Sequence, residues 1–191
     1  MLIQLNLPKP NTDLINYSIK IINDFEFAYR KLDWCKKTYG FNHSYADYEY
    51  YIDDYITSST LTQFQCYFKY AIDKVYLIMN NSHDGLPRVM PPHTDKYRKT
   101  AINFYPKLGG CNSKLTLYKQ YGSDQLNESD LAPYNQLSKE SVHSLAENTW
   151  FGFNAKQFHS LENITSKRLC LALFFTEPFD QFCKMHSHLI S

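Results

Sequence analysis

The sequence lacks several patterns that would assign it to a functional class at once. Its formal net charge is only +1 over 191 residues, without a long run of lysine or arginine, which argues against nucleic-acid binding. No stretch approaches the roughly 18 apolar residues of a membrane-spanning helix. Met1 to Leu5 are not a charged start leading into a long apolar stretch, so we expect no signal peptide. The sequence therefore predicts a cytoplasmic protein with no membrane attachment.

Cysteines are few and lack the spacing of a structural site. There are five, an odd number, and no two form a C-x-x-C motif. Neither a disulfide framework nor a zinc site is indicated. We expect buried free thiols in a reducing compartment, at Cys35, Cys66, Cys111, Cys170 and Cys183.

Aromatic residues are plentiful, with 16 tyrosines and 13 phenylalanines. The hydrophobic share is 43% and the charged share 20%, which is typical of one globular domain, 1–191, with a ring-rich core. Residues 45–55 combine tyrosines with acids. This segment is either a half-buried element with solvated acids or a surface for a substrate or partner.

The first 75 residues are predicted to be mostly helical. Leu2 to Leu7 form an apolar segment, and we expect an edge strand that prolines terminate. Apolar residues then recur at helical spacing and predict a long amphipathic helix over 13–37. Helical spacing returns over 61–75. These elements make 1–75 a mostly helical flank.

Beyond residue 75 the pattern indicates short strands between turn residues. We predict a core over 76–178 that is an antiparallel barrel or sandwich, giving a mainly β fold with N-terminal helices. We expect a long surface loop over 120–148 and a polar tail over 179–191 with solvated His186 and His188. Trp150 is expected in the core. The predicted strand segments are 75–79, 101–105, 114–118, 150–153 and 168–176.

The candidate chemistry begins at His93-Thr-Asp95. In an extended segment, residues two apart point to the same side, so imidazole and carboxylate can converge on one metal ion. H-x-D alone is a weak signal. However, His159 follows a strand-like segment downstream and offers a second imidazole. Two histidines and one carboxylate form the facial triad that suits non-haem Fe(II), because three coordination positions stay open.

Arg168 opens a strongly apolar strand nine positions after His159. Its guanidinium can pair with a carboxylate through two parallel hydrogen bonds, so it suits an organic acid that binds the metal at its other end. Alternation along the strand puts Cys170 and Ala172 beside Arg168, leaving room for a pocket, and puts the leucines on the other face. A tight turn after His159 would accommodate this spacing; if it cannot, Arg168 would miss the pocket and Lys167 would replace it.

These residues resemble the H-x-D…H…R signature of Fe(II)/2-oxoglutarate-dependent oxygenases, especially the prolyl- and aspartyl/asparaginyl-hydroxylase-like group. The similar segments are 93–104, His159 to Asn163, and the strand that begins at Arg168. The resemblance covers roughly 88–176 and leaves out the N-terminal 70 residues.

The resemblance implies a double-stranded β-helix (jelly-roll, cupin-like) core. It also implies a dioxygenase of the hydroxylase type that couples decarboxylation of 2-oxoglutarate to C–H oxidation with O₂. Its Fe(II) ligands would be His93, Asp95 and His159. Arg168 would bind the distal carboxylate of the cosubstrate, and Asn103 or Tyr105 could contact it. The substrate would be peptidyl or a small molecule, and nothing in the sequence indicates an oligomeric state.

Two alternatives stay open. One is a cupin-like module that binds a metal or ligand without oxidation, and the other is an interaction protein that uses the tyrosine-rich segment 45–55. The presence of all three ligands and the arginine in the expected order favours the oxygenase.

Overall fold

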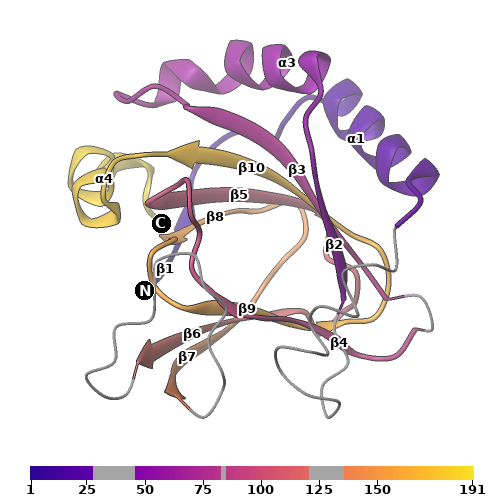
Figure 1. Ribbon diagram of the computed structural model, residues 1–191. Coiled ribbons are helices and arrows are strands. Elements are labelled where there is room, and N and C mark those ends of the chain that lie inside the picture. Colours follow the sequence, from indigo (N-terminus) through magenta and orange to yellow (C-terminus); the bar gives the residue numbers. More distant parts are fainter. Residues whose placement is uncertain (28–45, 83–84, 121–135) are drawn as a thin grey trace.

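Two antiparallel sheets face each other in the computed structural model, which describes residues 1–27, 46–82, 85–120 and 136–191 (Figure 1). The six-stranded sheet has the order β1 (Leu2–Leu5), β8 (Trp150–Asn154), β5 (Thr100–Lys107), β10 (Arg168–Phe175), β3 (Lys74–Asn81), β2 (Asp47–Tyr51). The four-stranded sheet has the order β4 (Arg88–His93), β9 (His159–Ile164), β6 (Lys114–Gln120), β7 (Leu137–Ser144). The protein is thus mainly β with N-terminal helices, as predicted, and its two sheets are compatible with a β-sandwich.

Strand β10 lies inside the six-stranded sheet, and all its residues are buried. Leu169, Leu171 and Leu173 belong to the core cluster under the helices, whereas Cys170 and Ala172 belong to the cluster that includes residues of both sheets. Alternation along a strand puts neighbouring residues on opposite faces. The predicted division of this strand into a leucine face and a small-residue face is confirmed.

Helices α1 (Thr12–Asp24) and α3 (Asp54–Phe64) cover the outer face of the six-stranded sheet (Figure 1). The side chain of Asn11 accepts a hydrogen bond from the Leu14 N–H at 2.8 Å and begins α1. The side chain of Asp53 does the same for α3. The 3₁₀ turn η1 (Gln65–Tyr67) follows α3.

The predicted helix 13–37 was too long, because α1 ends at Asp24 and Phe25 is extended. The Phe25 ring packs edge-on against Phe27 and Tyr51. Phe25 makes these contacts from an extended backbone that ends the helix. Residues 28–37 of the prediction lie outside the described residues. The segment 61–75 is helical only in part, since β3 begins at Lys74.

The predicted helical flank 1–75 also contains two strands of the six-stranded sheet. Strand β1 is its expected edge strand, and β2 comes from the tyrosine-rich segment. The predicted surface loop 120–148 was wrong in its second half, where β7 pairs with β6. Strand β7 is polar on both faces and mostly exposed, so no hydrophobic alternation marks it.

The C-terminal segment is not a polar tail. Helix α4 (Phe179–Met185) and the 3₁₀ turn η3 (Ser187–Leu189) bury Phe179, Phe182 and Leu189. His186 is fully buried, and its Nε2 accepts a hydrogen bond from the Lys69 N–H at 3.0 Å. The prediction of a solvated His186 was therefore wrong, whereas His188 is exposed as expected.

Several remaining predictions can be compared directly. Trp150 is in the core, and its indole N–H donates to the Pro8 carbonyl. Cys170 is buried, but Cys66 and Cys111 are free and exposed, contrary to the expectation of buried thiols, and Cys35 lies outside the described residues. Within the part of the chain that the structure describes, no helix is both long and apolar enough to span a bilayer.

Candidate metal centre

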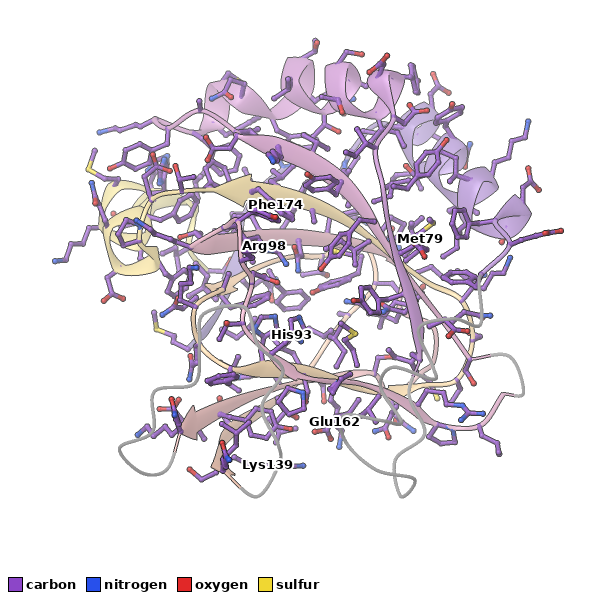
Figure 2. The ribbon with its side chains drawn as sticks, in the orientation of Figure 1. Met79, His93, Arg98, Lys139, Glu162 and Phe174 are labelled. Atoms are coloured by element: carbon purple, nitrogen blue, oxygen red, sulfur yellow. The ribbon has the colours of Figure 1, made fainter. Side chains whose placement is uncertain are left out.

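Two histidines meet because β4 and β9 are neighbours in the four-stranded sheet. His93 and His159 are direct cross-strand partners, and their ring centroids are 4.3 Å apart. Figure 2 shows His93 between the two layers, below Arg98 and Phe174. Lys139 and Glu162 lie on the outer side of the same sheet, so alternation along β9 separates His159 from Glu162. The pairing of these strands therefore sets the distance between the two imidazoles.

Asp95 completes the cluster from the loop after β4. Its N–H donates to the Ala155 carbonyl at 2.9 Å, which holds the loop in place. Asp95 Oδ1 lies 3.8 Å from His93 Nε2, and Asp95 Oδ2 lies 3.9 Å from His159 Nε2. The ligand atoms of all three residues lie within 4.8 Å of one another. The structure thus brings together the three residues that the sequence predicted as metal ligands.

Hydrogen bonds to the backbone set the tautomer of both histidines. His93 Nδ1 lies 2.8 Å from the Pro91 carbonyl oxygen, and His159 Nδ1 lies 2.9 Å from that of Gln157. A carbonyl oxygen only accepts, so each Nδ1 carries the hydrogen. In the neutral imidazole the lone pair is then on Nε2, and both Nε2 atoms face Asp95. This is the usual arrangement of metal-binding histidines, in which the second ring nitrogen is tied to the protein.

His159 is held in its neutral form. Burial, followed by the proximity of His93, lowers its pKa from 6.5 to about 3. Only the neutral imidazole offers a lone pair to a metal ion. The side chain is therefore ready to coordinate at neutral pH.

We expect this burial to make the metal-free protein less stable as the pH falls from 6.5 toward 3. Above pH 6.5 the imidazole is neutral in both folded and unfolded chains; between the two values only the unfolded chain binds the proton. The loss is about 1.4 kcal/mol per pH unit. Urea unfolding in chelator at several pH values should show a slope that His159→Gln loses. Equal slopes in both proteins would contradict this account.

Arg98 is a buried residue of the site to which the sequence analysis gave no role. Its Nε donates to Asp95 Oδ2 at 2.5 Å, and its Nη1 donates to Asn103 Oδ1 at 3.1 Å. Its guanidinium lies 4.4 Å from the centre of the Phe174 ring. Arg98 thus fixes one oxygen of Asp95 and leaves the other facing His93.

The charge of Arg98 also keeps Asp95 ionised. Burial alone would raise the pKa of Asp95, but Arg98 and the two histidines outweigh it and lower the pKa below its ordinary value. Asp95 in turn outweighs the effect of burial on Arg98 and raises its pKa. The pair is therefore ionised throughout the neutral range.

Arg168 lies in the same pocket, on the opposite sheet. It is 1% exposed, and its Nη1 donates to the side chain of Asn80, its cross-strand partner, at 2.9 Å. Its guanidinium lies 4.7 Å from the centre of the Tyr105 ring. Among the residues with described positions, Nε has no hydrogen-bond partner, and no carboxylate forms an ion pair with Arg168. A buried cation without an anion is a natural place for an acidic ligand.

Lys167 cannot replace Arg168. Its ammonium group donates to three backbone carbonyls at the end of α1, those of Ile22, Asn23 and Phe25. It stabilises the helix C-terminus, where a positive charge is favourable. The short spacing between His159 and Arg168 is accommodated by the turn between β9 and β10.

Asn103 and Tyr105 both line the pocket, because they are two apart on β5. The Asn103 amide donates to the Tyr105 hydroxyl at 3.2 Å. Burial raises the pKa of Tyr105 to about 12, so it stays a neutral phenol. These two residues connect Arg98 to Arg168 across the inner wall.

The site consists of two adjoining pockets. The inner pocket, between the three candidate ligands and Arg168, has a cavity volume of about 30 Å³, which holds one or two waters. The outer pocket, on the far side of His93 and Asp95, has a volume of about 370 Å³. A ligand larger than water enters the inner pocket only if lining side chains move apart.

Comparisons with known proteins add little to this geometry. No protein-family model matches the chain, and no curated protein matches its sequence. Among solved structures, the chain is similar to the X-ray structure of E. coli ycfD, with a TM-score of 0.43 and 10% sequence identity. The alignment covers 85% of this chain and 49% of that one, so this chain spans about half the length of that protein. The conclusions below rest on the site alone.

Proposed function

We propose that this chain is an Fe(II)- and 2-oxoglutarate-dependent oxygenase with a double-stranded β-helix, or jelly-roll, core. The observation that carries the proposal is the convergence of two imidazoles and one carboxylate within 4.8 Å, with a buried arginine in the same pocket. This donor set suits non-haem Fe(II) and leaves positions for a bidentate acid and O₂. The two antiparallel sheets are compatible with the proposed core.

The residues fit the metal by the chemistry of their donors. In the neutral histidines both Nε2 atoms carry the lone pair, and Asp95 is ionised and has one oxygen that Arg98 does not hold. When bound, Fe(II) with 2-oxoglutarate and O₂ supplies oxidative decarboxylation of the acid coupled to oxidation of a substrate C–H bond. Burial of the ligands keeps bulk water away from that chemistry.

Arg168 is the proposed partner of the distal carboxylate of 2-oxoglutarate. It has a hydrogen-bond donor without a partner and a charge that no described carboxylate balances. Its planar fork matches a carboxylate through two hydrogen bonds. Asn103 and Tyr105 would border the bound acid. Because the inner pocket is narrow, binding of a five-carbon diacid requires side chains there to shift.

The test is an anaerobic titration of the protein with Fe(II) and 2-oxoglutarate. We expect a weak visible charge-transfer band and, after admission of O₂, release of succinate. Asp95→Ala should lose both, because it removes one of three ligands. Asp24→Ala, at the exposed end of α1, is the matched control and should keep both.

The outcomes separate the two classes of function. A metal-binding protein that shows neither the band nor succinate would be a cupin-like binding module. An unchanged band in Asp95→Ala would contradict the proposed ligand set. The proposed substrate is peptidyl or a small molecule, and the lining of the outer pocket bears on which of the two it is.

A further inference from the structure

The outer pocket is the larger cavity, and it adjoins two of the candidate metal ligands, His93 and Asp95. Its volume of about 370 Å³ is within the usual range for small-molecule sites. Rings and one thioether form most of its wall: Tyr48, Tyr50, Tyr76, Tyr97, Phe174 and Met90. An apolar or aromatic molecule bound here would lie next to the metal.

Lys96 lines this pocket, and Lys74 lies beside it, near the same Tyr97 ring. Lys74 and Lys96 place their ammonium groups 5.3 and 5.4 Å from the centre of the Tyr97 ring, which is 66% exposed. Neither lysine forms an ion pair with any carboxylate whose position is described. The rim therefore carries two positive charges without partners among these groups.

The neighbouring acids point away from the pocket or bind other groups. Asp95 is already paired with Arg98. Asp47 and Glu49 alternate with the pocket-lining tyrosines along β2 and so point to the other face of the strand. The carboxylate of Asp73 accepts a hydrogen bond from the Thr176 N–H. Across both pockets, arginines and lysines outnumber the carboxylates.

This excess of positive charge distinguishes between two kinds of ligand. Aromatic walls alone could hold an organic cation. Here the ammonium groups of Lys74 and Lys96 already lie near the Tyr97 ring, so a cationic ligand would be repelled at the rim. A guest with a negative group is attracted instead, over a screening distance of about 10 Å in 0.1 M salt.

We infer that the outer pocket binds the oxidisable substrate, and that this substrate is a small organic acid with an apolar or aromatic body. Its carboxylate lies at the rim near Lys96 and Lys74, and its body lies among the tyrosines beside the metal. This inference rests on the proposed function, because it places the substrate next to the iron.

Calorimetric titrations with matched acid and amide pairs test it. The probes are 3-phenylpropionate against 3-phenylpropanamide and octanoate against octanamide. They are added to Zn(II)-loaded protein with and without saturating 2-oxoglutarate. We expect at least one acid to bind about tenfold tighter than its amide, the effect of roughly one favourable charge interaction, and the difference to shrink at high salt.

The double variant Lys74→Gln/Lys96→Gln should reduce the preference for the acid over the amide to about twofold or less, because the charge interaction is lost. Lys20→Gln, on the exposed side of α1, is the control and should keep the preference. Amides that bind as well as acids, no binding by any probe, or a preference that survives in the double variant would each overturn the inference. None of these outcomes affects the charge-transfer band with Fe(II) and 2-oxoglutarate. Failure of this inference is therefore distinguishable from failure of the oxygenase proposal, which would abolish that band.

Discussion

Replacing Arg168 by methionine is expected to remove most of the stabilisation of the protein by 2-oxoglutarate while changing the stability of the metal-free protein by only about 1 kcal/mol. Arg168 is a buried cation that has no described carboxylate partner, so its removal ends a desolvation cost as well as one hydrogen bond to Asn80. Methionine fills a similar space without a charge. The 2-oxoglutarate, in contrast, loses the guanidinium group proposed to bind its distal carboxylate.

The expected size of the effect follows from linkage. Wild-type protein loaded with Zn(II) should gain about 2.7 kcal/mol in free energy of unfolding at a cosubstrate concentration 100 times its Kd. Arg168→Met should weaken 2-oxoglutarate binding by about 100-fold, since truncating one partner of a buried charge pair costs about 2–5 kcal/mol. Urea unfolding with and without 2-oxoglutarate measures both quantities.

The neighbouring Lys167 provides the control. Lys167→Met removes a charge one position away, and with it three hydrogen bonds to the end of α1. It should lower stability yet keep the full response to 2-oxoglutarate. An Arg168→Met protein that is stabilised by 2-oxoglutarate as strongly as wild type would rule out the proposed role of Arg168.

Arg98→Met is expected to be the most destabilising single change in the site, at about 3–5 kcal/mol in the metal-free protein. The buried carboxylate of Asp95 would lose its strongest partner, and Asn103 would lose a donor. A divalent cation should restore part of the loss, because it neutralises the same carboxylate. Urea unfolding in chelator and then in excess Zn(II) measures the two states.

Arg98→Lys separates charge from geometry. A single ammonium group can neutralise Asp95, but it cannot bridge Asp95 and Asn103 as the guanidinium does. We therefore expect an intermediate loss of stability and a smaller gain from Zn(II) than in Arg98→Met. If Arg98→Met were as stable as wild type in chelator, the Asp95–Arg98 pair would have no structural role.

The candidate metal centre could be predicted from the sequence because its parts follow local rules. The H-x-D spacing places two side chains on one side of an extended segment, and the alternation of β10 places Arg168 opposite its leucines. What sequence reasoning could not provide was the pairing of β4 with β9, which brings His159 to His93. That contact was inferred from residue types, since pairing between remote strands depends on the whole sheet.

The missed residues belong to turns and to cross-strand contacts. Arg98 follows Asp95 by three positions in a loop, where no periodicity shows which way a side chain points. Asn80 became visible only through its register with Arg168. The burial of His186 was foreseeable in part, because Phe179 and Phe182 have helical spacing just before it. Polar residues around those phenylalanines concealed the short helix.

The halves of the centre belong to different layers of the molecule. The candidate metal ligands come from the four-stranded sheet and the loop after β4, whereas Arg168, Asn103 and Tyr105 come from the six-stranded sheet. The span from metal to guanidinium is therefore set by the thickness of the filling between the sheets, where Leu115, Leu161 and Cys170 lie. On the proposed function, changing the bulk of this filling would change which length of diacid fits between metal and guanidinium, without altering any group that touches the acid's charges.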